Sequence, residues 1–144
     1  MRLTSKDLAR AKKNGGKFVP LEGKLQNQVC KYLKLQYPRV LFRVDFGAGA
    51  LLTGKQAKQQ QYQQKTSGWP DIFICEPKGD FAGLFIELKR EDEVIYKGNG
   101  MFKNYHIREQ FAVHVALRER GFKCEFAKGF DQAKILIDRY LSLT

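Results

Sequence analysis

The chain has 144 residues, 43% of them apolar, which suits one globular domain with a sizeable core and leaves too little chain for two. No apolar run approaches the ~20 residues of a transmembrane helix, and the charged amino-terminal segment lacks the apolar stretch of a secretory signal. The net charge of +11 favours a polyanionic partner such as nucleic acid, although charge that serves only solubility is the alternative.

The positive charge is concentrated in two segments. Residues 1–20 hold six basic residues against one acid, and residues 54–65 hold three lysines, many glutamines and no acid. We expect residues 1–20 to form a basic arm and residues 21–144 a single domain. Candidate phosphate contacts, each of which also fits a solvated surface charge, are Lys12, Lys13, Lys17, Arg43, Lys55, Lys58 and Lys65.

Apolar spacing and turn residues predict alternating helices and strands. Leu25, Val29 and Leu33 recur every four residues and make one helical stripe, and Gly121 stops a later helix. The elements expected in chain order are a basic helix at 4–13, a helix at 21–38, a strand at 40–46, a helix or loop at 50–67, strands at 71–75 and 83–89, a loop at 90–104, a helix at 106–121, a strand at 122–127 and a helix at 131–141.

Two neighbouring strands carry charge where core strands normally do not. Asp71 opens the strand 71–75, and Glu87 and Lys89 close the strand 83–89. Side chains alternate along a strand, so Glu87 and Lys89 point to one side, about 7 Å apart. If the strands pair as a hairpin, Asp71 joins them. A divalent cation would relieve the repulsion between the carboxylates, and the ammonium would hold or activate a water, which outlines metal-assisted phosphodiester hydrolysis.

These residues also carry a family resemblance. Asp71 followed by Glu87-Leu88-Lys89 resembles the Asp…Glu-x-Lys signature of the PD-(D/E)XK nuclease superfamily. "GWPDIFI" and "GLFIELKRE", with Glu22 in an upstream helix and Gln110 in a downstream one, resemble the VRR-NUC branch over residues 21–127. The resemblance implies an α/β fold with a restriction-endonuclease-like α-β-β-β-α-β core, a mixed central sheet flanked by helices, and here a C-terminal helix.

The resemblance also assigns roles to individual residues. It implies that Asp71, Glu87 and the backbone carbonyl of Leu88 bind Mg²⁺ or Mn²⁺, and that Glu22 completes the acidic cluster. Lys89 would orient or deprotonate the attacking water and stabilise developing charge on the phosphate.

The remaining implications concern the reaction and its partners. Gln110 would brace Lys89 or the water. The implied activity is a metal-dependent DNA endonuclease, selective for branched, junction or flap DNA, that acts as a homodimer because two strands are cut in symmetric substrates. Such a basic, small nuclease suits a phage-like, cytoplasmic protein. The alternatives are a sequence-reading restriction-type nuclease and a non-catalytic DNA-binding protein with the nuclease fold.

Each site residue also has a purely structural interpretation. Glu22 suits the positive end of a helix dipole, Asp71 suits a turn, and Glu87 with Lys89 suits a surface salt bridge worth ~0–1 kcal/mol. Glutamine is ordinary on a helix, as at Gln110.

Other residues give weaker signals. The eight-residue spacing of His106 and His114 does not suit a helical metal pair, and His114 fits a histidine with satisfied hydrogen bonds. The glycines at 47–54 do not have the spacing of a phosphate-cradling loop, so no small-molecule cofactor is expected. The three cysteines, which are far apart in the sequence, are expected to be buried thiols in a reducing compartment: Cys30, Cys75 and Cys124.

Overall fold

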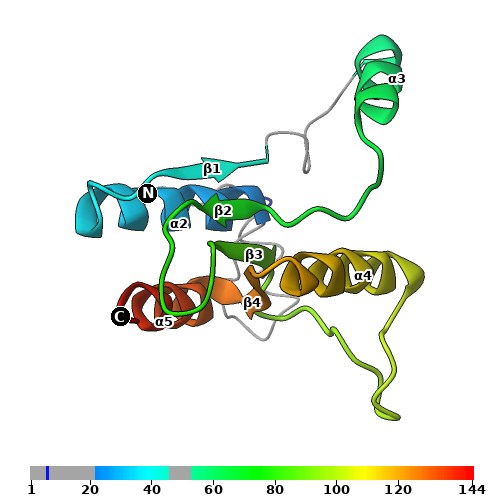
Figure 1. The fold of residues 1–144 in the computed structure, drawn as a ribbon. Helices are drawn as coiled ribbons and strands as arrows, with labels where there is room; N and C mark the ends of the chain where they lie inside the picture. The colour runs from blue at the N-terminus through cyan, green and yellow to red at the C-terminus, as the bar shows by residue number, and fades with distance from the viewer. Residues whose placement is uncertain (1–5, 7–21, 46–52) are drawn as a thin grey trace.

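The computed structural model describes residues 6, 22–45 and 53–144, and of Glu22 it describes only the backbone (Figure 1). The predicted basic helix at 4–13 therefore lies outside the described residues apart from Lys6, as do Lys12, Lys13 and Lys17. The division of the chain at residue 20 stays a prediction.

The elements follow the predicted order with one addition. They are α2 (Glu22–Gln36), β1 (Phe42–Val44), α3 (Gly54–Gln63), β2 (Ile72–Ile74), β3 (Leu84–Lys89), α4 (Tyr105–Glu119), β4 (Lys123–Lys128) and α5 (Gly129–Leu141). The expected α-β-β-β-α-β order omitted α3. Thr53 and Gln56 form a capping box at the start of this helix, which resolves the ambiguous segment 50–67 in favour of a helix.

Two helix ends are explained by the residues that follow them. α2 ends at Gln36, two residues before Pro38, because proline disfavours a helical conformation in the residue that precedes it. Gly121 adopts φ +91°, a left-handed conformation that few side chains tolerate, and it follows the end of α4. β1 is shorter than the expected strand at 40–46.

The four strands form one mixed sheet in the order β1-β2-β3-β4. β1 pairs antiparallel with β2, and β2 antiparallel with β3, as expected for a hairpin of β2 and β3. β3 and β4 run parallel, and α4 makes the crossover that parallel neighbours require. The mixed sheet flanked by helices, with a C-terminal helix, confirms the predicted fold class.

Helices cover both faces of the sheet (Figure 1). On one face the side chains of β3 that face α2 and α5 are Leu84, Ile86 and Leu88. On the other face Phe85 packs with Val113 and Leu117 of α4. The predicted alternation of side chains along β3 is therefore confirmed.

Other features of the described residues bear on the remaining expectations. α3 buries none of its residues and projects away from the sheet (Figure 1). None of the described helices is both long and apolar enough to cross a membrane. All three cysteines are free, but the expectation that all are buried is wrong: Cys124 is buried, Cys30 is half-buried and Cys75, just beyond β2, is exposed.

Candidate active site

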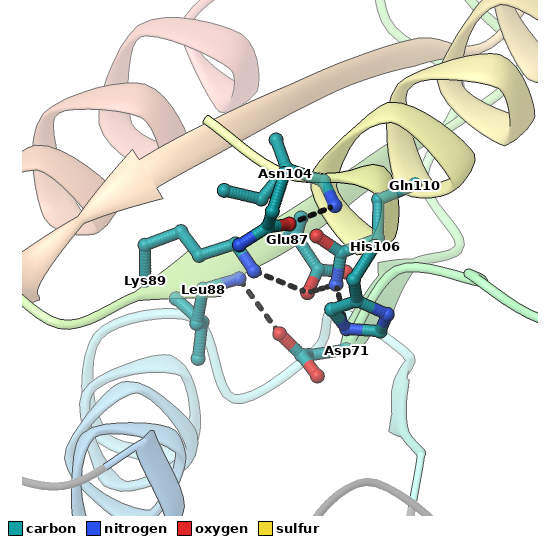
Figure 2. Close-up of polar contacts among 8 residues, drawn as sticks. Asp71, Glu87, Leu88, Lys89, Asn104, His106 and Gln110 are labelled. Carbon is teal, nitrogen blue, oxygen red and sulfur yellow. Dashed lines mark hydrogen bonds and ion pairs between the residues drawn. The ribbon is translucent and has the colours of Figure 1, made fainter. Parts of the chain in front are cut away.

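The pairing of β2 with β3 brings the two predicted carboxylates together. Ile72 lies opposite Ile86, so the adjoining residues Asp71 and Glu87 meet where β2 begins. The Leu88 backbone N–H donates a 2.7 Å hydrogen bond to Asp71 Oδ2 (Figure 2). Asp71 is only 7% exposed and Glu87 only 3%, so this contact fixes one carboxylate beside another in a place that excludes most water.

An ammonium completes this buried group. Lys89 is 3% exposed, and its Nζ lies 3.7 Å from Glu87 Oε1. Glu87 and Lys89 point to the same side of β3, as the sequence predicted (Figure 2). A surface salt bridge is thereby excluded as the interpretation of this pair, because both side chains are buried and a buried pair carries a large desolvation cost.

The surroundings of Asp71 make its carboxyl harder to ionise than an exposed one. Burial raises the pKa of its carboxyl, the Leu88 N–H and Lys89 oppose this rise, and the charge of Asp45 adds to it. Asp45, which directly follows β1 and donates its N–H to the Asp71 carbonyl (2.8 Å), is a residue that sequence reasoning missed. The available signal was a carboxylate at the end of a strand next to the one that Asp71 opens.

Gln110 joins the site from α4. Its Nε2 donates a 2.7 Å hydrogen bond to Glu87 Oε1 and lies 3.3 Å from His106 Nε2 (Figure 2). The amide nitrogen has two hydrogens, so it donates to both partners when His106 Nε2 is the unprotonated acceptor. Among the described residues Gln110 Oε1 is buried and has no hydrogen-bond partner. This oxygen is therefore an available acceptor beside the carboxylates.

His106 is a second neighbour that sequence reasoning missed. It lies one helical turn before Gln110, and this i, i+4 spacing was the available signal. The sequence analysis considered His106 only as a metal-binding partner of His114. Asn104 caps α4 by accepting a 2.9 Å hydrogen bond from the Ile107 N–H. The cap fixes the start of the helix and thereby the positions of His106 and Gln110.

Comparison with known proteins gives the same fold. No family model matches the sequence, and no curated protein matches it. Among solved structures, the chain is similar to a "VRR_NUC domain protein" with 22% identity and a TM-score of 0.53, over 85% of this chain and 93% of that one. A second, a "VRR_NUC domain", is 22% identical with a TM-score of 0.45, over 80% of this chain and 96% of that one.

The chain has the VRR_NUC fold. This likeness confirms the fold that was expected from "GWPDIFI" and "GLFIELKRE". The two strands that carry these motifs are the paired strands β2 and β3.

The oxygens at the centre of this VRR_NUC fold fit a hard divalent cation. Asp71 and Glu87 supply carboxylates, and the Leu88 carbonyl lies between Glu87 and Lys89 in the chain. Within residues 22–45 and 53–144, no group of three or more His, Cys, Asp or Glu side chains is gathered to hold a metal. Mg²⁺ is commonly held by one or two carboxylates together with waters and substrate phosphates, so this donor set suits Mg²⁺ or Mn²⁺. The Glu22 side chain lies outside the described residues.

His114 occupies the core beneath the site. It is fully buried, its ring lies 4.4 Å from that of Phe126, and neither ring nitrogen has a hydrogen-bond partner among the described residues. The expected histidine with satisfied hydrogen bonds is therefore not what the structure places here. Burial, with the nearby charges of Arg118 and Lys89, lowers the pKa of His114 to about 4 and keeps the ring neutral.

The predicted phosphate contacts that the structure describes lie on the surface. Arg43 is exposed on β1, Lys55 and Lys58 are exposed on α3, and Lys65 is exposed just after it. These four cations form no ion pair with a described residue. Their availability is compatible with DNA binding, which stays a prediction.

Proposed function

We propose that this chain is a metal-dependent endonuclease that hydrolyses phosphodiester bonds of DNA with Mg²⁺ or Mn²⁺. The observation that carries the proposal is the burial of two carboxylates and one ammonium, Asp71, Glu87 and Lys89, at one end of the sheet. A buried excess of negative charge destabilises the fold unless a cation offsets it. The VRR_NUC fold supports the same activity.

The residues divide the chemistry between them. Asp71, Glu87 and the Leu88 carbonyl would hold the ion, with Glu22 as a further acid. The bound ion supplies Lewis acidity and a more acidic water. Lys89 donates hydrogen bonds toward the phosphate oxygens and stabilises the negative charge that grows in the transition state. Gln110 Oε1 accepts a hydrogen bond from the attacking water and orients it.

The partners follow from charge and from the reaction. The net charge of +11 favours association with a polyanion such as DNA. We propose selectivity for branched, junction or flap DNA and a homodimer that cuts two strands. The rivals are a sequence-reading nuclease and a DNA-binding protein without activity, and they differ from the proposal in substrate range and in turnover.

Cleavage of end-labelled four-way junction, flap and linear duplex DNA tests the proposal. Wild type, Asp71→Asn and Lys89→Met are compared in Mg²⁺, Mn²⁺, Ca²⁺ and EDTA, with Lys31→Met, an exposed lysine of α2, as the matched control. We expect wild type and control to cleave in Mg²⁺ or Mn²⁺ and both site variants to lose ~10²–10³-fold or more. Full activity of Lys89→Met would reject the assigned site, and tight binding without cleavage would favour the binding protein.

A further inference from the structure

A short hairpin-like segment, residues 95–103, lies between β3 and α4 in the chain and contains none of the residues predicted to contact DNA. Its backbone is cross-linked: Lys97 N–H donates to the Met101 carbonyl (2.7 Å) and Lys103 N–H to the Ile95 carbonyl (2.8 Å). Tyr96 and Phe102 form a β-bridge across it. Ile95 is buried and anchors its base. We call residues 95–103 the basic hairpin.

The basic hairpin and the start of α4 enclose a pocket of about 420 Å³ with cations around it. Lys97, Lys103 and Arg108 line this pocket, and none of their side chains forms an ion pair or hydrogen bond with a described residue. Residues 94–108 contain no Asp or Glu. Three exposed cations that line one pocket create a positive potential there, which favours an anionic partner.

Among the described residues, some other surface cations are paired with carboxylates, whereas Arg43 and the lysines of α3, like the cations of the pocket, are not. Arg118 and Lys123 both lie within ion-pair distance of Glu125, and Arg90 pairs with Asp92. The pocket at the basic hairpin is therefore distinguished from these positions by the lack of pairing, and not merely by the presence of basic residues.

Exposed aromatic rings accompany the cations. Tyr105, the first residue of α4, is 73% exposed and lines the pocket, and Tyr96 is 50% exposed. Tyr96 stacks on Phe102 with ring centroids 5.3 Å apart, and Phe102 packs on Phe111 at 4.8 Å, so the platform is supported from the core side. Aromatic faces beside unpaired cations are the combination that binds unpaired nucleotides, because bases stack while phosphates meet the charges.

The pocket and the candidate active site are close to each other along the chain. The basic hairpin follows Lys89 along the chain, and Tyr105 immediately precedes His106, which contacts Gln110. Both the pocket and the candidate site therefore take residues from the first turns of α4.

We propose that this pocket binds an unpaired nucleotide of the DNA, with its phosphates at Lys97, Lys103 and Arg108 and its base stacked on Tyr105. The choice of DNA rests on the proposed nuclease function. Duplex DNA keeps its bases stacked on one another, so the pocket confers a preference for substrates with a single-stranded segment.

Fluorescence anisotropy in EDTA, where no cleavage occurs, tests the proposal with labelled oligothymidylate and a duplex of equal length. We expect Tyr105→Ala to weaken oligothymidylate binding roughly tenfold while duplex binding changes less than about twofold, because one stacked base is lost. Tyr105→Phe should retain wild-type binding. Tyr62→Ala, a tyrosine 93% exposed on α3, is the matched control. Replacing both Lys97 and Lys103 by alanine should reduce the salt slope of binding by ~1.4, at ~0.7 per phosphate contact.

Equal binding by wild type and Tyr105→Ala, or an equal loss on both DNAs, would overturn the inference, as would a wild type that does not bind oligothymidylate. The outcome is separable from the nuclease activity. A wild type that cleaves DNA but binds independently of Tyr105 retains the proposed function and loses this inference. A wild type that binds through Tyr105 but never cleaves retains this inference and contradicts the proposed function. Circular dichroism spectra confirm that each variant is folded.

Discussion

On one face of β3, Leu84, Ile86 and Leu88 pack against α2 and α5, whereas on the other face Glu87 and Lys89 lie beneath α4 with Gln110. Both faces are buried to the same degree. Burial stabilises the apolar side chains of β3, including Phe85 on the α4 side, but it does not by itself stabilise the charged side chains of Glu87 and Lys89. One strand therefore anchors the fold with alternate residues and builds the candidate site with the others.

Substitutions of adjacent residues of β3 should give the largest effects and separate its two roles. Ile86→Ala should lower the free energy of unfolding by ~2–5 kcal/mol, because it leaves a cavity in the core. Glu87→Gln should reduce cleavage by ~10³-fold or more and leave stability nearly unchanged. The site holds two carboxylates for one ammonium, so removal of Glu87 leaves Asp71 to balance Lys89. Thermal unfolding followed by circular dichroism and a cleavage assay measure the two effects.

The two variants control for each other, because Ile86→Ala is expected to change stability and not cleavage, and Glu87→Gln cleavage and not stability. Ile86→Ala, assayed well below its melting temperature, should retain cleavage close to the wild-type rate. Unfolding of Glu87→Gln, or unchanged stability in Ile86→Ala, would contradict the division of labour between the faces.

His114 is a polar residue buried on the α4 side of the sheet, and neither ring nitrogen has a polar partner among the described residues. In the folded chain its pKa is lowered to about 4 from 6.5. Between pH ~6.5 and ~4 the unfolded chain therefore binds a proton at His114 that the folded chain does not bind. The contribution of His114 to stability is therefore intact above pH ~6.5 and is lost as the pH falls toward 4, by about 3 kcal/mol in total at ~1.4 kcal/mol per pH unit.

His114→Leu removes this proton and retains an apolar side chain of similar size. We expect its free energy of unfolding, from urea titrations between pH 7 and pH ~4.5, to fall less steeply with decreasing pH than that of the wild type. His106→Ala, which removes an exposed histidine, is the control. Equal slopes for His114→Leu and wild type would show that the buried ring does not oppose protonation.

Much of this arrangement was predictable from the two-residue repeat of strands and from the Asp…Glu-x-Lys motif. The alternation of β3 and the hairpin pairing of Asp71 with Glu87 follow from the two-residue repeat of a strand, which fixes both faces once the register is set. Gln110 followed from its position downstream of the motifs that resemble the VRR-NUC branch. These predictions depend on local geometry that every strand or helix obeys.

Other features depended on tertiary contacts that local patterns do not contain. Asp45 reaches Asp71 only because β1 pairs with β2, and the contact of His106 with Gln110 depends on where Asn104 starts the helix. Cys75 is exposed because β2 ends at Ile74, one residue earlier than its apolar sequence indicated. The capping box at Thr53 was readable in the sequence, but the glutamine-rich composition concealed it.

His106 gives a smaller effect on the charged face. When His106 Nε2 is the acceptor, its hydrogen bond with Gln110 Nε2 fixes the orientation of the amide, and in the proposed mechanism the amide oxygen then accepts from the attacking water. His106→Ala should lower kcat by about tenfold, as loss of an outer hydrogen-bond partner typically does, with little change in KM. His106→Gln, which supplies another acceptor, should restore part of kcat. Steady-state cleavage kinetics measure the split, and an effect confined to KM would contradict the positioning role.

Asp71→Asn gives the smallest effect, an increase in stability. Burial raises the pKa of the Asp71 carboxyl, so its stability contribution is complete below the ordinary pKa of 3.8 and is lost as the pH rises through the raised value. At neutral pH the metal-free variant should therefore melt above the wild type, and in a chain of this size each ~1 kcal/mol of stability corresponds to roughly 2–4 °C. The asparagine oxygen still accepts the Leu88 hydrogen bond. Mg²⁺ should raise the Tm of the wild type but not of the variant, because a ligand stabilises only the state that binds it. A lower Tm for Asp71→Asn without metal would mean that the carboxylate stabilises the fold, and the charged face of β3 would then no longer differ in kind from the apolar one.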